Sequence, residues 1–450
     1  MRFFAIPDLL PPWVKLVPVL LLAAAMSACA VLSKDGGEAE VRSKAAKVAG
    51  VPADNAVTAE TRAALRDRLL AQSLDSESAV RLALLNNPGL QSRFAELRIS
   101  ETEIVRAARP RNPGISLARL SQGGAHETDR TVVLDIMGLL TAPVRAPLAH
   151  AQFEAEKLAV EKYVLQLARD TRMAWVEAIA AQQRARYAGD VVTAAEAGRD
   201  LAVSLQQQGN ISALDAAQEQ AFHNEAIALQ HRAQSDASSA REQLLRLLGL
   251  TQVDALILPD SLPALPEQAR TLKHIEQQAL AQRIDVRQAK QVLDNTARAQ
   301  KLTNSTRFIN VLDLGYQRNT FSGQPGQTGF EVSFELPLFD SGDSKKAEAE
   351  AIYQRALAQT AATAVQACSE ARDAYQRYHT AWELARHYRD EVIPVQQKIS
   401  NETLLRYNGM LLSTFDVLAQ AKQQVASTES GMLALRDFWL ADAQLDSALQ

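Results

Sequence analysis

The sequence contains little cysteine, few aromatic residues and no excess of positive charge. Cys29 and Cys368 are the only cysteines among its 450 residues, so a disulfide framework is not expected. Aromatic residues make up 5% of the chain, which favours long, closely approaching helices over one thick globular core. The formal net charge is −4, whereas a nucleic-acid binder needs clustered positive charge to neutralise phosphates. The composition therefore argues against a nucleic-acid partner.

The sequence also lacks the motifs of catalysis and of cofactor binding. It has no phosphate-binding loop, nucleophile elbow or cluster of metal ligands. Its histidines are scattered, and the pairs His223/His231 and His379/His387 lie on helical segments at a spacing that is typical of solvated or interfacial residues. We therefore expect neither an enzyme nor a bound cofactor or metal.

The longest apolar run of the sequence lies near its N-terminus. Beyond residue 29 no window of about 18 uninterrupted apolar residues occurs, so no membrane-spanning helix is expected there. Residues 1–28 have the layout of a secretory signal, in which a short apolar run, Leu16–Met26, follows basic residues. Small residues directly before Cys29 resemble the lipobox of bacterial lipoproteins, in which this cysteine is acylated and becomes the mature N-terminus. In that pattern, Ala30 rather than an aspartate after the cysteine implies passage to the outer membrane. Ordinary signal cleavage near Ala30 is the alternative.

The rest of the chain consists of two copies of one plan. Three pairs of segments match at nearly constant offsets of about 196 to 200 residues: Arg111–Ile115 with Arg307–Val311, Val132–Ile136 with Val332–Leu336, and Gly209 with Gly409. The predicted organisation is an anchored segment with a short helix at 29–73, a first repeat at 74–250, a linker at 251–271 and a second repeat at 272–450.

Each repeat is expected to contain one β-hairpin. Apolar and polar side chains alternate along Val132–Ile136 and along Phe330–Leu336, with Ile136 on the apolar face, and this period of two is typical of strands. Turn-forming residues separate the strands, so we predict hairpins at about residues 114–137 and 309–337. A half-buried sheet in a soluble protein shows the same alternation. In lipid, however, four strands would leave unsatisfied edges, so several chains would have to close the sheet.

Helices are expected to fill the remainder of each repeat. The first helices are predicted at Leu74–Ala108 and Leu272–Leu302, and long helices at about Ala149–Gln208 and Lys345–Tyr407. A helix of some 60 residues extends about 90 Å, so it needs neighbours along its length. Apolar and small residues recur at three- and four-residue steps, which is the spacing of coiled-coil-like seams. Pro394 is expected to mark a local bend.

Both long helices are predicted to end in the same kind of tip. Gly209 and Gly409 suit the left-handed residue just beyond a helix C-terminus. The segments Ser212–Asp215 and Ser413–Asp416 have the Ser-x-x-acid pattern that caps the start of a following helix. Each repeat therefore turns back on itself as a helical hairpin.

This order of elements is similar to that of the TolC family of outer-membrane efflux proteins, over essentially the whole mature chain. Three local patterns also resemble the family: Asn86–Leu90 its N-terminal helix signature, Leu336–Gly342 its strand-to-helix motif, and Arg406–Gly409 with Asp416–Leu418 its second tip. The first repeat departs from the family pattern at Ile136–Pro143, which leaves the geometry of its strand-to-helix junction open.

The resemblance implies a mainly α fold with a small transmembrane β part. In a homotrimer, the duplicated long α-hairpins would form an α-barrel tunnel, and four strands per chain would complete a twelve-stranded β-barrel. The implied function is the outer-membrane channel of a tripartite export system, which passively conducts substrates from a periplasmic adaptor and an inner-membrane transporter. A lipid-anchored periplasmic coiled-coil or adaptor protein without a pore is the alternative, and a lipid-anchored hydrolase has no supporting motif.

The resemblance also assigns roles to the two tips. The residues expected to dock the adaptor are Gly209, Asn210, Ser212, Gly409, Met410 and Ser413. Asp416, and Asp215 in the first repeat, are the candidates for a ring of negative charge at the periplasmic aperture. Acids in the first turn of a helix also interact favourably with the helix dipole, and this simpler explanation applies to both.

Overall fold

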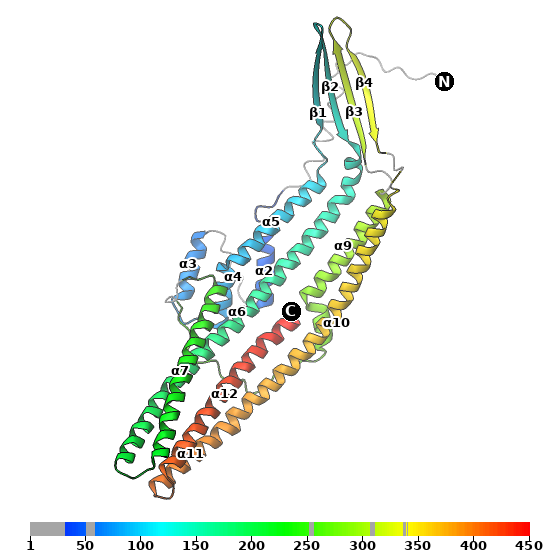
Figure 1. The fold of residues 1–450 in the computed structure, drawn as a ribbon. Helices are drawn as coiled ribbons and strands as arrows, with labels where there is room; N and C mark the ends of the chain where they lie inside the picture. Colours follow the sequence, from blue (N-terminus) through cyan, green and yellow to red (C-terminus); the bar gives the residue numbers. More distant parts are fainter. Residues whose placement is uncertain (1–31, 51–58, 252–255, 307–310, 336–338, 340) are drawn as a thin grey trace. The chain divides into compact units, whose positions relative to one another are not determined.

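The computed structural model describes residues 32–50, 59–251, 256–306, 311–335, 339 and 341–450. Cys29 and the predicted signal segment lie outside these residues. The chain forms two compact units, and each draws segments from both sequence repeats (Figure 1). The first unit comprises the described parts of Met1–Val41, Arg93–Val160 and Asp285–Thr363, and the second those of Arg42–Ser92, Glu161–Ile284 and Ala364–Gln450.

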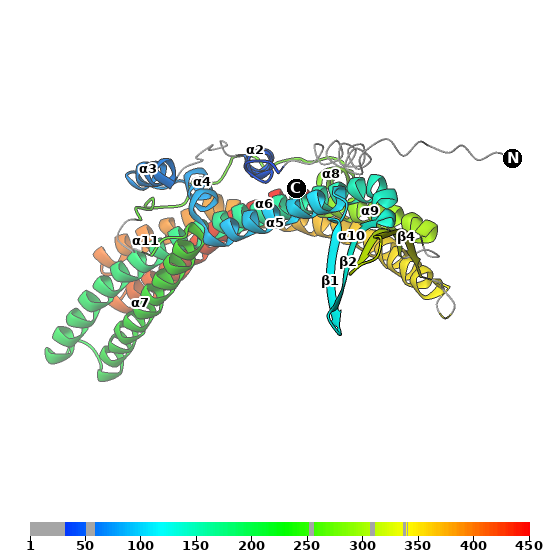
Figure 2. The ribbon, with the colours of Figure 1, turned by 90° about the horizontal axis from the view of Figure 1, so that it is seen from above.

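A four-stranded antiparallel sheet belongs to the first unit (Figures 1 and 2). Its strands, in spatial order, are β1 (Gly114–Gln122), β2 (Ala125–Asp135), β3 (Leu312–Phe321) and β4 (Gln327–Phe334). Both predicted pairs of strands are present. The pairing of β2 with β3, from Asp135 opposite Asp313 to Glu127 opposite Phe321, joins the hairpin of the first repeat to that of the second.

The first strand-to-helix junction differs from the prediction. We expected Ile136 on a strand and the long helix only from Ala149, but α6 (Ile136–Gln207) begins directly where β2 ends. The carboxylate of Asp135 accepts a hydrogen bond from the Gly138 backbone N–H at 2.6 Å. A side-chain acceptor at this position satisfies one of the free N–H groups of the first turn, so the helix can start without an intervening loop.

Two prolines lie inside the first turns of α6. Pro143 and Pro147 each lack the N–H that a helix interior uses, and proline at such a position ordinarily kinks or ends a helix. The Arg145 guanidinium donates to the Gly138 carbonyl at 2.9 Å and so adds a hydrogen bond within the same turns. The predicted start of the long helix, at about Ala149, was therefore too late.

The first helix of each repeat is broken, which the sequence patterns did not predict. The segment predicted at Leu74–Ala108 forms α4 (Ser76–Asn86) and α5 (Pro88–Ala108), with Asn87 between them. The segment predicted at Leu272–Leu302 forms α8 (Ile275–Gln282) and α9 (Ile284–Thr306), with Arg283 between them. Ahead of α4 lie α2 (Glu38–Ala49) and α3 (Ala59–Leu70).

Each break caps the C-terminus of the helix that returns from the tip of the same repeat. In the first repeat, the Asn87 amide donates to the Leu247 carbonyl of α7 (Ala213–Leu248) at 2.9 Å, and its oxygen accepts from the Leu90 N–H at 3.0 Å. In the second repeat, Arg283 donates to the Ala448 carbonyl of α12 (Thr414–Leu449) at 3.3 Å. The duplicated plan therefore keeps the location of the cap and changes its chemistry.

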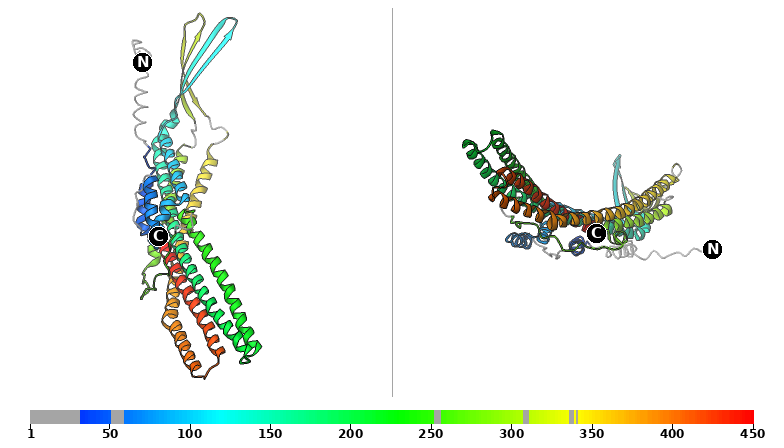
Figure 3. Two further views of the ribbon diagram at one scale, coloured as in Figure 1. Left: turned by 90° about the vertical axis from the view of Figure 1, so that its left-hand side faces the viewer. Right: turned by 90° about the horizontal axis from the view of Figure 1, so that it is seen from below.

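The second unit contains two helical hairpins, α6 with α7 and α11 with α12 (Figure 3). The long helix of the second repeat consists of α10 (Asp343–His387), a π-helical turn at Tyr388–Val392 and α11 (Ile393–Asn408). The π-helical turn directly precedes Pro394, in agreement with a local irregularity there. The two hairpins contact each other through an ion pair of 3.0 Å between Arg184 and Glu429.

The cores of the second unit are thin and rich in alanine. In one cluster, Tyr378 and Phe438 are each 1% exposed and their ring centroids lie 5.5 Å apart. Ala374, Ala385 and Ala434 surround them. Small residues let the helix backbones approach closely, which agrees with the seams predicted from the composition. Among the described residues, no helix is both long and apolar enough to cross a membrane.

Replacing Asn87 tests the capping arrangement. Asn87→Ala removes the oxygen that accepts from the Leu90 N–H and the amide that donates to the Leu247 carbonyl. Asn87 is only 8% exposed, so water replaces these hydrogen bonds poorly. We expect a loss of about 2 kcal/mol or more in the free energy of unfolding, seen as a lower midpoint in thermal unfolding followed by circular dichroism. Asn210→Ala, at an exposed tip residue, is the matched control and should change stability by less than about 0.5 kcal/mol. Equal shifts for the two variants would exclude a capping role.

Candidate functional surfaces at the helical tips and on the sheet

The tip between α6 and α7 has the conformation that the sequence predicts. Gly209 adopts a left-handed backbone with φ of 74°, and the following N–H, of Asn210, donates to the Leu205 carbonyl at 2.9 Å. The Ser212 hydroxyl accepts from the Asp215 N–H at 3.1 Å, while the Asp215 carboxylate accepts from the Ser212 N–H at 3.2 Å. This reciprocal capping box starts α7.

The tip between α11 and α12 departs from the prediction at one position. Gly409 has an ordinary φ of −80°, and Met410 takes the left-handed conformation with φ of 60°. The Leu411 N–H donates to the Arg406 carbonyl at 2.9 Å and closes the turn as Asn210 does in the first tip. Ser413 and Asp416 then form the second capping box.

The two tips are therefore equivalent at an offset of 201 residues rather than 200. Met410 corresponds to Gly209, Ser413 to Ser212, and Asp416 to Asp215. The predicted match of Gly209 with Gly409 was wrong by one residue, because a glycine was assumed to hold the left-handed position in both turns. A non-glycine residue in that conformation costs roughly 1–2 kcal/mol, so the second tip carries backbone strain that the first lacks.

Apolar side chains are exposed around the second tip. Met410 is 94% exposed, Leu411 76% and Leu405 66%. In the first tip, Leu214 is also exposed. A cluster of large apolar residues on a helical turn is typical of a surface that another protein covers. We call Leu405, Met410 and Leu411 the apolar tip.

The proposed aperture residues act as helix caps within the chain. Hydrogen bonds from the Ser413 hydroxyl and from the Ser413 N–H hold the pKa of Asp416 below its ordinary value of 3.8. Asp416 is exposed and carries its charge at neutral pH, and Asp215 occupies the same position in α7. Capping accounts for the contacts of both acids, and an aperture role stays a prediction.

The sheet presents two faces of different chemistry. The apolar face carries, at the strand ends nearest the helices, Ile115, Leu117, Val132, Leu134, Leu312, Leu314, Tyr316, Phe330, Val332 and Phe334. Phe330 is 81% and Ile115 74% exposed, and the Tyr316 and Phe330 rings lie 5.5 Å apart. The opposite face carries the carboxylates, namely Glu127, Asp129, Asp135, Asp313 and Glu331. The predicted sorting is thus complete for the acidic side chains, whereas the carboxylate face also carries Leu120, Val133 and Phe321.

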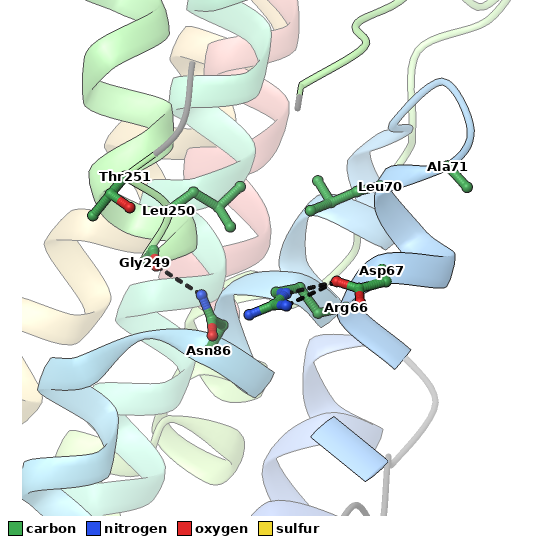
Figure 4. Close-up of a pocket in the computed structure, with 8 residues that line it drawn as sticks. All are labelled: Arg66, Asp67, Leu70, Ala71, Asn86, Gly249, Leu250 and Thr251. Carbon is green, nitrogen blue, oxygen red and sulfur yellow. Dashed lines mark hydrogen bonds and ion pairs between the residues drawn. The ribbon is translucent and has the colours of Figure 1, made fainter. Parts of the chain in front are cut away.

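A cavity of about 550 Å³ lies between α3 and the end of α7 (Figure 4). Its polar side chains are already engaged. Arg66 pairs with Asp67 at 2.9 Å, and the Asn86 amide donates to the Gly249 carbonyl at 2.7 Å. Within the described ranges, no group of three or more potential ligands could hold a metal ion.

The strain at Met410 can be tested with single substitutions. Met410→Gly should stabilise the protein by about 1 kcal/mol, because glycine adopts the left-handed conformation without steric cost. Gly209→Ala should destabilise it by about 1 kcal/mol for the opposite reason. Gly409→Ala is the matched control, since φ is negative there and an added Cβ would meet its nearest atom at 3.5 Å. Urea unfolding monitored by circular dichroism measures all three. A destabilised Met410→Gly variant would show that the turn is not strained.

No model of a protein family matches the chain, and no curated protein does. Solved structures match it over most of its length. A membrane protein from Pseudomonas aeruginosa has a TM-score of 0.70 at 18% identity, covering 83% of this chain and 93% of its own. The Campylobacter jejuni outer membrane channel CmeC has a TM-score of 0.67 at 16% identity, with 88% of both chains covered.

The open state of the Neisseria gonorrhoeae outer membrane channel MtrE matches with a TM-score of 0.68 at 16% identity, covering 85% of this chain and 89% of its own. At such low sequence identity, these TM-scores show that the backbone is arranged in the same way. The chain therefore has the fold of the TolC-family outer membrane channels.

Proposed function

We propose that the protein is the outer-membrane channel of a tripartite export system and that it works as a homotrimer anchored through a lipid on Cys29. The observation that carries the proposal is the fold, which agrees with solved outer membrane channels over 85–88% of the chain. In this arrangement the channel is passive. Substrates reach it from an inner-membrane transporter through a periplasmic adaptor, and the transporter supplies the energy.

The exposed apolar face of the sheet supports a location in lipid. Side chains such as Ile115 and Phe330 would be costly to leave in water, whereas lipid covers them favourably. The carboxylate face then lines the aqueous interior, as in transmembrane sheets that enclose water. A periplasmic adaptor without a pore, the rival function, needs the helical hairpins but gives no reason for a sheet with these two faces.

The edges of the sheet support a trimer. Among the described residues of one chain, β1 pairs only with β2 and β4 only with β3, so the outer backbone groups of β1 and β4 have no partner strand there. Unsatisfied backbone groups are not tolerated in hydrocarbon. β1 and β4 run antiparallel, so β4 of one copy can pair with β1 of the next. Three copies of four strands then close a twelve-stranded barrel, and the helical hairpins of the three copies form an α-barrel tunnel.

The tips support docking of the adaptor. The apolar tip combines strong exposure with a turn that is held by backbone hydrogen bonds and a capping box. A rigid apolar surface of this kind loses little conformational entropy when a partner covers it. We place the adaptor contact at Gly409, Met410 and Ser413, together with Gly209, Asn210 and Ser212 of the first tip.

Cross-linking between strand edges tests the trimer. Ser116→Cys in β1 and Glu331→Cys in β4 point to the same face but lie about 16 Å apart within one chain. They are separated by three strand spacings of about 4.8 Å across the sheet and by two residues along the strands. In a Cys368→Ala background, a short bismaleimide should therefore link different copies. We expect covalent dimers and trimers in denaturing gels of outer-membrane fractions.

The matched control places both cysteines in one chain. Thr131→Cys and Gln317→Cys are direct cross-strand partners on that same face, so the reagent should link them without increasing the molecular mass. Reaction of this control pair, together with only monomers from the edge pair, would contradict closure by three copies. Complete release of the protein from the outer-membrane fraction when acylation of Cys29 is blocked would favour the lipid-anchored adaptor alternative.

Charge substitutions in the apolar tip test adaptor docking. Met410→Asp with Leu411→Asp should reduce co-purification of the adaptor from detergent-solubilised cells by roughly tenfold or more, because each introduced carboxylate loses hydration on docking. Met410→Leu with Leu411→Met keeps the surface apolar and should bind normally. Outer-membrane insertion, measured by the edge cross-link, should be the same in both variants. Full adaptor recovery with the acidic pair would place docking elsewhere.

A further inference from the structure

The charged residues of the sheet are sorted completely by sign. All three arginines within the strands, Arg119, Arg130 and Arg318, share the face that carries the apolar residues. The five strand carboxylates all lie on the opposite face. We call Arg119, Arg130 and Arg318 the arginine trio. Because successive side chains of a strand point to opposite faces, this sorting requires each charged residue, in all four strands, to occupy a position that points to the face of its sign.

The arginine trio lies directly beyond the apolar part of its face. Ile115, Val132, Tyr316 and Phe330 form one row across the four strands. In the next row toward the hairpin turns, about 7 Å further on, Arg130 stands directly opposite Arg318. Arg119 follows one row later, opposite Thr128. Along β3 the order on this face is therefore apolar at Leu314, aromatic at Tyr316 and cationic at Arg318, and Leu117 of β1 lies beside Arg130.

The pairing of Arg130 with Arg318 is unfavourable within the chain. Two like charges at directly opposed positions of a sheet repel each other. All three side chains are exposed, and the strand carboxylates that could neutralise them point to the other face. No acidic side chain shares their face within the four strands as described. A counter-ion for this row must therefore come from another molecule.

We propose that the arginine trio binds the phosphate group of an anionic membrane lipid headgroup. The inference rests on the proposed function, because it requires the apolar face to contact lipid. A guanidinium group binds a phosphate through two parallel hydrogen bonds, and adjacent guanidinium groups can share one dianionic phosphate. Arginine is costly at the middle of a bilayer and costs little near the interface, so this row marks the headgroup level. Tyr316 and Phe330 precede it as aromatic residues do at a membrane boundary.

Native mass spectrometry of the full chain in a neutral detergent can count bound lipids. The probes are phosphatidic acid, phosphatidylcholine with the same acyl chains, and inorganic phosphate at equal concentration. The wild type should retain phosphatidic acid in preference to phosphatidylcholine. Arg130→Gln with Arg318→Gln should weaken phosphatidic acid binding roughly 25-fold, if each arginine contributes about fivefold near a membrane surface. Arg130→Lys with Arg318→Lys should keep most of the preference.

Arg372→Gln with Arg377→Gln is the matched control, since it removes two exposed charges from α10 and should leave binding unchanged. Three results would overturn the proposal: equal retention of the two lipids by the wild type, an undiminished preference in the Arg130/Arg318 glutamine variant, or equal binding of inorganic phosphate. The last would identify a site for free anions rather than for a headgroup.

The cross-link between β1 and β4 measures membrane location and assembly independently of lipid binding. If the wild type forms no cross-linked trimer in the outer membrane, the proposed function fails. If it does, and the lipid preference is absent or independent of these arginines, only the headgroup site fails. The Arg130/Arg318 glutamine variant should still fold and cross-link, because it removes a repulsive pair and leaves every backbone hydrogen bond of the sheet in place.

Discussion

The pairing of β2 with β3 is the interaction on which both faces of the sheet depend. Each repeat supplies one two-stranded hairpin, and an isolated hairpin is at best marginally stable in water. Joining them places Leu134 opposite Leu314 and Val132 opposite Tyr316, so that the apolar residues of both repeats share one face. A slip of one residue would turn every side chain of one hairpin to the other face. It would mix arginines with carboxylates and break the apolar face at the same time.

The same repeated plan satisfies the ends of the helices in two chemically different ways. Asn87 breaks the first helix of its repeat and caps α7, and Arg283 does so for α12, with the Ile284 N–H donating to the Gln450 carbonyl at 2.9 Å. Terminal carbonyls of a helix need donors, and either an amide or a guanidinium can supply them. Duplicated segments can thus diverge in sequence where only the position of a donor is constrained. The break itself stays at the same place in both repeats.

Much of the fold could be predicted because its strongest signals are periodic. The alternation along the strands, the seams of small residues and the two Ser-x-x-Asp caps all reappear in the structure. The features that were predicted wrongly depend on single residues, which produce no periodic pattern in the sequence. Asp135 caps α6 and allows it to begin before two prolines. Asn87 lies between two helices, directly before Pro88 at the start of α5, and the carbonyl that it caps in α7 is distant in sequence. Met410 holds a position where a glycine was expected, which only the backbone reveals.

The candidate surfaces were predictable to different degrees for the same reason. Both tips could be located from short motifs, since a turn and its caps are contiguous in sequence. The sorting of charge on the sheet could not, because Arg130 and Arg318 come from different repeats and become neighbours only through the register of β2 with β3. Within either hairpin alone, a few scattered arginines carry no information. Across the paired strands, their common face places them beside the apolar residues and away from every strand carboxylate. A sheet with water on both sides gives no reason to separate its charges by sign. A sheet between an aqueous interior and a phosphate-bearing membrane surface does, because each face then contacts a medium that favours one sign.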